Sequence, residues 1–366
     1  MPGTGFLSDE RCFWHAGGSF AFLTPVGGMV QPLVAGGLPE APETKRRLKN
    51  LVAVSGLASE LACTGAPSAT RDDLLRVHPA SYLDAFKALS DQGGGEIGLR
   101  APFGPGGFEI AALSAGLVVE AVRRVAAGEL RNAYALSRPP GHHCLPDWPN
   151  GFCLLNNCAV AVETAIAAGQ AERVAIVDWD VHHGNGTEAV FWDRPDVLTI
   201  SIHQERNYPL DTGEVEATGG EGAEGANVNI PLLPGAGHKA HLEVMDRIVL
   251  PKLRRFEPDL VVVACGFDGA GVDPLSRLLC SAETYRQMTL RLMDLTGGKL
   301  VCAHEGGYSE MYVPFCGHAV LEAMSGTEIR LDDPLGPRLA GQQPNARFDA
   351  LQSEMIGEMA GFFGLS

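Results

Sequence analysis

The chain alternates short apolar runs with longer stretches in which apolar residues recur at helical spacing. Continuous apolar runs such as those within 173–178 and 259–265 are typical of strands that are covered on both faces. Strands of this kind belong to parallel sheets, whose two faces are both packed against helices. The strands predicted in this way are 132–137, 173–178, 197–202, 259–265 and 299–303.

Helical patterns lie before and between these strands. The predicted helices are 107–128, 158–169, 241–256 and 284–295, and Asn156 or Asn157 is a suitable N-cap for the second. Strands that alternate with helices predict a three-layer α/β fold with a central, mostly parallel β-sheet flanked by helices. No change in composition suggests a linker, so we expect a single domain over residues 1–366.

Ionisable or hydroxyl residues follow nearly every predicted strand. The carboxyl ends of parallel strands meet at one edge of a sheet, where such folds build their sites, so we expect these residues to converge. They are Arg138, His142 and His143 after the first strand; Asp178, Asp180, His182 and His183 after the second; Ser201 and His203 after the third; Asp268 after the fourth; and His304, Glu305 and Tyr308 after the fifth.

The segment 178–186 contains the strongest candidate for a metal site. If the extended conformation continues to His182, then Asp178, Asp180 and His182 lie on one face. Two carboxylates and an imidazole suit a metal such as zinc, and Asp268 could add a ligand. Three protein ligands with an open position are typical of a catalytic zinc. The alternative is that the carboxylates cap turns and the imidazole packs in a polar loop.

Two further motifs could perform proton transfer. His142 and His143 follow the stiff turn 139–141, and histidine can both accept and return a proton near neutral pH. They could equally face solvent or be additional metal ligands. Tyr308 follows two glycines, and its phenol could donate to an oxyanion, although a tyrosine in this position often only packs.

Charge and composition exclude some functions. The chain has 28 Lys and Arg against 44 Asp and Glu, a net charge of −16. This balance argues against binding nucleic acid or anionic membranes through a basic surface and favours attraction of cationic ligands. The nine cysteines form no Cys-x-x-Cys pair, and neither a signal peptide nor a long apolar run is visible. We therefore expect a cytoplasmic protein.

Taken together, the motifs resemble those of the histone deacetylase family. They are RPPGHH (138–143), GFCLLNN (151–157), DWDVHHGNGT (178–187), LTISIH (198–203), GFD (266–268) and EGGY (305–308), in the family's order. The chain looks most similar to class II members and to bacterial histone-deacetylase-like amidohydrolases. The resemblance implies an arginase-like fold and hydrolysis of N-acetyl amides, with N-epsilon-acyl-lysine as the substrate type.

The resemblance also implies a role for each site residue. Asp180, His182 and Asp268 would bind one Zn²⁺ per chain, and His142 and His143 would be the tandem catalytic histidines. Asp178 would orient His142, Asn185 would stand beside His143 as in class II, and Tyr308 would polarise the carbonyl. Gly151, Phe152, Tyr208 and Gly306 would line the acyl-lysine tunnel, with Leu275 at its rim. A structural K⁺ would lie near Asp178, Asp180, His182, Ser201 and Ile202.

Two departures from the family pattern concern the pocket. Tyr208 replaces a more usual Phe, and the rim acid of class I members falls near Leu99 and Arg100, where no acid stands. The implied partners are acetylated lysine peptides or proteins, and we expect a homo-oligomer. An acetylpolyamine amidohydrolase shares these motifs and is the main alternative. An arginase-like ureohydrolase is disfavoured by the Asp-x-Asp-x-His order, and a non-catalytic acyl-lysine scaffold by the complete catalytic set.

Overall fold

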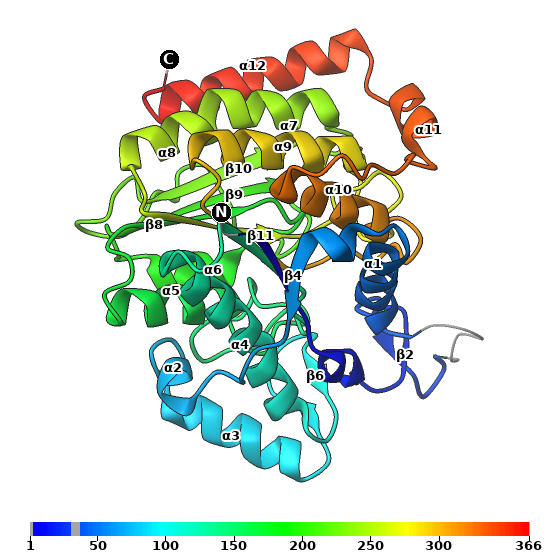
Figure 1. The fold of residues 1–366 in the computed structure, drawn as a ribbon, viewed down its shortest axis with the longest axis vertical. Coiled ribbons are helices and arrows are strands. Elements are labelled where there is room, and N and C mark those ends of the chain that lie inside the picture. The colour runs from blue at the N-terminus through cyan, green and yellow to red at the C-terminus, as the bar shows by residue number, and fades with distance from the viewer. Residues whose placement is uncertain (1–2, 31–36, 366) are drawn as a thin grey trace.

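The core of the protein is an eight-stranded sheet in which every pair of neighbouring strands is parallel (Figure 1). The computed structural model describes residues 3–30 and 37–365. Across the sheet the strands are β10 (Asn227–Leu232), β9 (Val197–Gln204), β8 (Val174–Asp178), β11 (Leu260–Cys265), β12 (Leu300–His304), β7 (Asn132–Ala135), β1 (Thr4–Leu7) and β4 (Leu61–Thr64).

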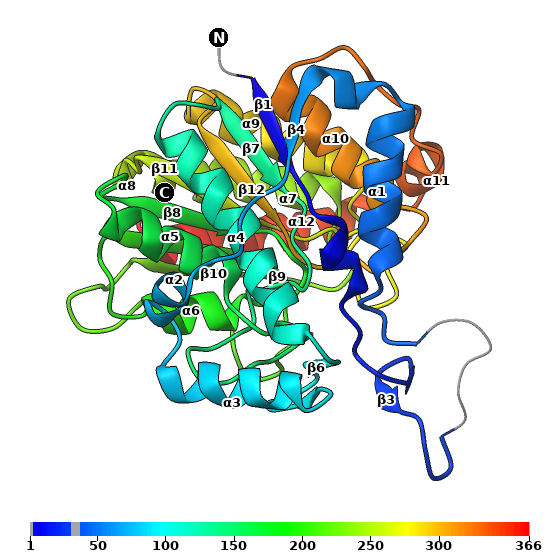
Figure 2. The same cartoon turned by 60° about the horizontal axis from the view of Figure 1, so that its bottom comes forward.

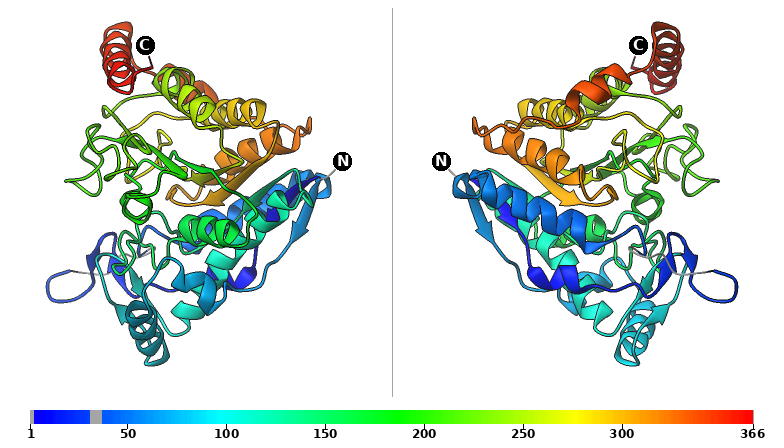
Figure 3. Two further views of the ribbon diagram at one scale, coloured as in Figure 1. Left: turned by 90° about the vertical axis from the view of Figure 1, so that its left-hand side faces the viewer. Right: turned by 90° about the vertical axis from the view of Figure 1, so that its right-hand side faces the viewer.

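Helices cover both faces of this sheet (Figures 1 and 3). One group contains α4 (Gly107–Ala126), α5 (Asn157–Ala167) and α6 (Asn185–Phe191), with α2 (Arg71–Leu75) and α3 (Ala80–Asp91) outside them. The other contains α1 (Pro42–Val54), α7 (His238–Val244), α8 (Leu250–Phe256), α9 (Ala282–Leu295) and α10 (Val313–Ser325), with α11 (Gly336–Gly341) and α12 (Ala346–Phe362) beyond. The predicted three-layer α/β fold is confirmed.

The remaining elements are short. Two hairpins, β2–β3 (Phe20–Ala21, Thr24–Pro25) and β5–β6 (Gly95–Glu96, Pro102–Phe103), lie outside the main sheet, and Figure 2 shows β3 at the edge of the molecule. The 3-10 helices are Glu10–Trp14 and Leu57–Glu60. Within the described residues, none of the helices combines the length and apolar character needed to cross a membrane.

All five predicted strands and all four predicted helices are present, with differences at their ends. The helix predicted over 241–256 begins at His238 and contains a π-helical turn, Met245–Val249, between α7 and α8. Asn156 caps α5 by accepting a hydrogen bond from the backbone N–H of Ala159 at 3.0 Å. Every residue of β8 and β11 is buried, as expected for strands covered on both faces.

A buried ionic cluster ties the N-terminal segment to the loop after β7. Arg138 donates to Glu40 Oε1 at 3.0 Å and to the carbonyl oxygens of Cys12 and His15 at 2.9 and 3.0 Å. Lys45 Nζ also donates to Glu40 Oε1, at 3.1 Å. Burial alone would raise the pKa of Glu40, but Arg138 and Lys45 outweigh it and lower that pKa to about 2. The cluster therefore fixes the start of the loop that carries His142 and His143.

Another buried group, the imidazole of His78, makes stability depend on pH. Its Nδ1 donates to Pro146 O at 2.8 Å and its Nε2 accepts from Asn156 N–H at 3.0 Å, so the ring must be neutral. Burial lowers the pKa of His78 to about 4. As pH falls below about 6.5, His78 becomes protonated in the unfolded chain but stays neutral in the folded protein. The free energy of unfolding therefore decreases by about 1.4 kcal/mol per pH unit until about pH 4, where the folded protein also takes up the proton.

We expect the free energy of unfolding in urea to decrease between about pH 6.5 and about pH 4.5, and less steeply in His78→Gln. The slope is the quantity to compare, because the substitution also alters stability at neutral pH. Parallel pH profiles for the two proteins would contradict this account of His78.

Candidate active site

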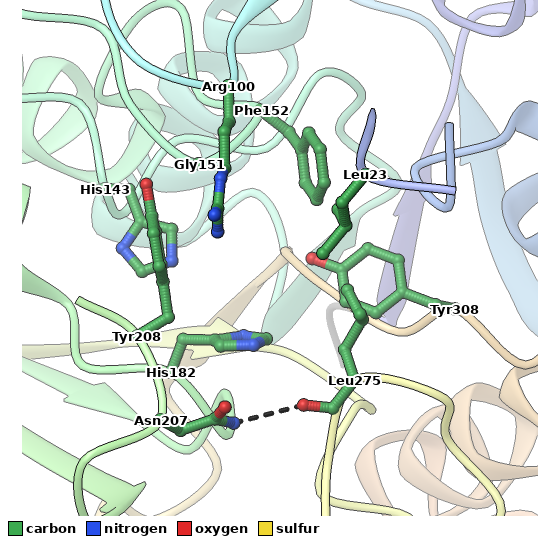
Figure 4. A pocket seen from close by; sticks show the side chains of 10 residues that line it. All are labelled: Leu23, Arg100, His143, Gly151, Phe152, His182, Asn207, Tyr208, Leu275 and Tyr308. Carbon is green, nitrogen blue, oxygen red and sulfur yellow. Dashed lines mark hydrogen bonds between the residues drawn. The ribbon is translucent and has the colours of Figure 1, made fainter. Parts of the chain in front are cut away.

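A cavity of about 220 Å³ opens at the carboxyl ends of the parallel strands (Figure 4). His143 follows β7, His182 follows β8, and Tyr308 follows β12, so the predicted convergence of polar loops is found here. The full lining is Leu23, Arg100, His143, Gly151, Phe152, His182, Asn207, Tyr208, Leu275 and Tyr308.

At one side of this cavity, Asp180, His182 and Asp268 form a buried cluster. Nδ1 of His182 lies 3.0 Å from Asp180 Oδ1 and 3.1 Å from Asp268 Oδ2, and the three possible ligand atoms lie within 4.8 Å of one another. Asp268 Oδ2 accepts no hydrogen bond from the described residues. A Cβ on Gly306 would stand 2.2 Å from Asp268 Oδ2 and 2.6 Å from Asp180 Oδ2. The absence of a side chain at Gly306 thus lets both carboxylates approach its backbone, whose N–H donates to Asp180 Oδ2 at 2.8 Å.

The route by which these side chains meet differs from the prediction. The extended conformation ends at Asp178, and the chain bends over residues 180–182. Asp178 Oδ1 accepts from the N–H of Asp180 at 3.0 Å, and Asp180 Oδ1 accepts from the N–H of His182 at 3.0 Å. These turns, rather than strand alternation, bring Asp180 and His182 to Asp268.

The charges in this cluster favour a bound cation. Burial and the nearby Asp180 carboxylate together raise the pKa of Asp268 to about 6. Burial alone would lower the pKa of His182, but the carboxylates of Asp180 and Asp268 beside its Nδ1 outweigh that effect and raise the pKa to about 10. Two buried carboxylates and one imidazole form a donor set that suits a borderline divalent metal.

His142 and His143 lie side by side next to the cluster, with ring centroids 4.0 Å apart and ring planes tilted by 40°. Nδ1 of His142 lies 2.9 Å from Asp178 Oδ2, and Nδ1 of His143 lies 2.8 Å from Asn185 Oδ1. Each histidine therefore has the predicted partner, one anionic and one neutral.

The two imidazoles differ in basicity. Burial alone would lower the pKa of His142, but Asp180 and Asp178 outweigh it and raise the pKa well above its usual value. Burial and the neighbouring His142 lower the pKa of His143 well below its usual value. His142 is thus the more basic and His143 the less basic imidazole of the pair.

Glu305 is an important residue to which the sequence analysis gave no role. Its Oε2 accepts from the backbone N–H of Gly141 at 2.6 Å and of His142 at 3.2 Å. Burial raises the pKa of Glu305 to about 7. The glutamate also lies near His142 and Cys153 in a second possible metal cluster, but its carboxylate already holds this backbone. Its place directly after β12 was the available signal in the sequence.

Asp273 was likewise missed and positions two pocket residues. Its Oδ2 accepts from the backbone N–H of Tyr308 at 2.7 Å, and its Oδ1 accepts from that of Leu275 at 2.9 Å. Burial raises the pKa of the Tyr308 phenol well above its usual range, so the group is a neutral donor. Tyr308 is thereby held at the pocket wall opposite His143 and Tyr208 (Figure 4).

Aromatic rings form the walls of the cavity. Phe152 lies 5.8 Å from the ring of Tyr308, and the ring of Tyr208 lies 5.1 Å from that of His143. The Tyr208 hydroxyl donates to Asn150 Oδ1. Gly151 has φ 51°, and a Cβ there would stand 2.4 Å from His143 Cδ2, so a side chain would collide with the histidine.

The other predicted residues are found at different positions. Leu275 lines the cavity, whereas Gly306 lies behind it against the carboxylates. Asp178 of β8 pairs in register with Ser201 of β9, and Ile202 follows on β9. Arg100 lines the cavity near the position where the resemblance placed the rim acid of class I members. Leu23 and Asn207 were not predicted; they come from the N-terminal hairpin and from a loop without a recognisable motif.

Comparisons with known proteins agree with this geometry. Residues 38–324 match the histone deacetylase domain family. The chain is 55% identical to a histone deacetylase-like amidohydrolase of Pseudomonas aeruginosa, over 99% of this chain and 96% of the relative. It is 38% identical to a probable deacetylase of Archaeoglobus fulgidus, over 71% and 73% of the two chains. A crystal structure of the HDA15 HD domain matches with a TM-score of 0.84 and 32% identity, covering 99% of this chain and 97% of that one.

Proposed function

The chain belongs to the histone deacetylase family, as its motifs predicted, and we propose that it is a zinc-dependent amidohydrolase of N-epsilon-acyl-lysine-type substrates. It would remove acetyl or related acyl groups and release a carboxylate and an amine. The observation that carries this proposal is the meeting of a buried Asp–His–Asp cluster, a histidine pair and a phenol around one aromatic-walled cavity.

The Asp180, His182 and Asp268 cluster fits one Zn²⁺ per chain. Its donor set, its burial and the unpaired Asp268 oxygen all agree with a metal that has three protein ligands. Zinc bound there would supply Lewis acidity next to the acyl carbonyl and acidify water.

The chain's own groups would perform the proton transfers. His143 is neutral because its pKa is lowered, so its Nε2 can take a proton from the attacking water and later give it to the departing amine. His142, held by Asp178 with a raised pKa, would place a positive charge beside the developing oxyanion. The Tyr308 phenol would donate a hydrogen bond to that oxyanion.

The cavity walls suit an acyl group on an aliphatic stem. Phe152 and Tyr208 offer aromatic faces, and the absence of a side chain at Gly151 lets the wall lie directly against His143. Leu275 would contact the substrate at the rim. Asn185, which is a second Asp in class I members, supports placing the chain in class II.

Two other assignments complete the proposal. A structural K⁺ would bind beside Asp178, Asp180, His182, Ser201 and Ile202, where β8 and β9 run side by side. Cytoplasmic location and homo-oligomeric assembly remain predictions from the sequence and the family.

A substrate panel with and without a chelator tests the function. We expect acetate release from acetyl-lysine peptides, its loss after chelation, and its recovery when zinc is returned. Faster turnover of acetylspermidine or acetylputrescine would favour the acetylpolyamine alternative. Binding of acetyl-lysine peptides without acetate release would favour a scaffold and contradict the proposal.

A further inference from the structure

Arg100 stands at a fixed position on the edge of the active-site cavity. Its backbone segment is joined to the cavity wall: Leu99 N–H donates to Pro149 O at 3.1 Å, and Gly151 N–H donates to Leu99 O at 3.0 Å. Phe152 N–H donates to the carbonyl of Arg100 at 2.7 Å. Arg100 itself has φ 55°, in the left-handed region that residues with a side chain rarely adopt. The surrounding hydrogen bonds stabilise this conformation. The backbone from which the Arg100 side chain extends is therefore held in place by hydrogen bonds to the cavity wall.

The guanidinium group of Arg100 is available to a ligand. It extends over the cavity between the rings of Tyr208 and Phe152 (Figure 4), and its Cζ lies 5.4 Å from the centroid of Tyr208. The residue is exposed, and among residues 3–30 and 37–365 no carboxylate forms an ion pair with it. The nearby Glu96 accepts instead from the backbone N–H of Ala101 at 3.1 Å. A planar cation resting on an aromatic face is positioned for a carboxylate.

We propose that Arg100 selects acylated amines that carry a carboxylate close to the acylated side chain. This inference rests on the proposed function and specifies its substrates. If the acyl-lysine side chain enters the cavity between Phe152 and Tyr208, its backbone and neighbouring residues stay at the cavity mouth, next to the Arg100 guanidinium. The carboxylate could belong to an Asp or Glu neighbour in a peptide, or be the free α-carboxylate of a C-terminal acyl-lysine. Either could form a paired hydrogen bond with the guanidinium.

This local cation opposes what the net charge predicts. A charge of −16 favours cationic substrates at long range, but salt screens that attraction over about 8–10 Å at physiological ionic strength. Arg100 acts at contact distance. An acetylpolyamine would bring an ammonium group to the cavity mouth, where Arg100 repels it. The cavity edge therefore disfavours acetylpolyamines relative to acyl-lysine beside an acid.

Matched acetyl-lysine peptides test this selectivity. The acetyl-lysine is flanked on both sides by Glu, Gln or Lys, and a further pair ends in acetyl-lysine as the free acid or the amide. At low salt we expect kcat/KM about threefold higher for Glu than for Gln, and about tenfold higher for Glu than for Lys, mostly through KM. The Glu-flanked peptides and the free acid report the two carboxylate sources separately.

Substitutions at Arg100 then assign the effect. Arg100→Gln should remove the preference, Arg100→Glu should reverse it, and Arg100→Lys should retain part of it. Arg347→Gln, an exposed change of the same charge on α12, should leave the preference intact. A wild-type enzyme that hydrolyses all peptides alike, prefers the Lys peptide, or keeps its Glu preference in Arg100→Gln overturns this inference. No acetate release from any peptide, with zinc present, would instead refute the proposed function.

Discussion

Replacing Tyr308 by Phe is expected to lower kcat for an acetyl-lysine peptide by about two to three orders of magnitude while the protein keeps its zinc. The substitution removes one hydroxyl and keeps the ring that packs against Phe152. Asp273 holds the backbone N–H of residue 308, so the position of the ring does not depend on the hydroxyl. The loss thus measures what the phenol contributes to stabilising the oxyanion.

Steady-state kinetics and elemental analysis of the same preparation separate catalysis from metal binding. Tyr285→Phe is a matched control, because its buried hydroxyl has no hydrogen-bond partner among the described residues and does not line the cavity. It should retain near-wild-type kcat. Near-wild-type deacetylation by Tyr308→Phe would remove Tyr308 from the mechanism.

Asp268→Asn should have the larger effect, reducing zinc well below one per chain and activity by at least about three orders of magnitude. The amide is nearly the same size as the carboxylate. Its oxygen can keep the hydrogen bond that Asp268 Oδ1 accepts from Val181 N–H at 2.8 Å, so the fold is retained. Its NH₂ would replace the unpaired Oδ2 that faces Asp180 and His182.

Zinc content by elemental analysis and acetate release are the two readouts. Asp72→Asn, in the exposed first turn of α2, removes the same charge far from the cavity lining and should bind one zinc and remain active. Full zinc content and activity in Asp268→Asn would exclude Asp268 as a ligand. Two manganese ions in the wild-type chain would point instead to a ureohydrolase-type centre.

Much of the fold was predictable because its central strands are buried on both faces. Runs such as Val174–Val177 of β8 and the whole of β11 are continuously apolar, which few structures other than a parallel sheet accommodate. β10 escaped prediction because it contains Asn227, Asn229 and Pro231 among its apolar residues. The Asn227 and Asn229 side chains donate to Glu188, a contact that the local sequence does not reveal.

The site residues were predictable where a polar side chain directly follows a strand, and not where their positions depend on how loops pack. His182 and Tyr308 could be placed because the ends of parallel strands share an edge. The bend at residues 180–182 could not be read from alternation, because side-chain hydrogen bonds to the backbone end the strand at Asp178. The resemblance placed the rim near Arg100, but the pairing of its segment with residues 149–152, which holds it at the cavity, does not follow from the local sequence.

The ionic cluster around Arg138 bears on how a fragment of this protein should be cut. The family match begins at residue 38, yet strand β1 lies between β7 and β4 and precedes it. A fragment covering only 38–324 would lose the carbonyl oxygens of Cys12 and His15. The buried guanidinium of Arg138 would then lack these two hydrogen-bond acceptors. The smallest piece that preserves the loop carrying His142 and His143 must therefore include the first strand as well as the matched range.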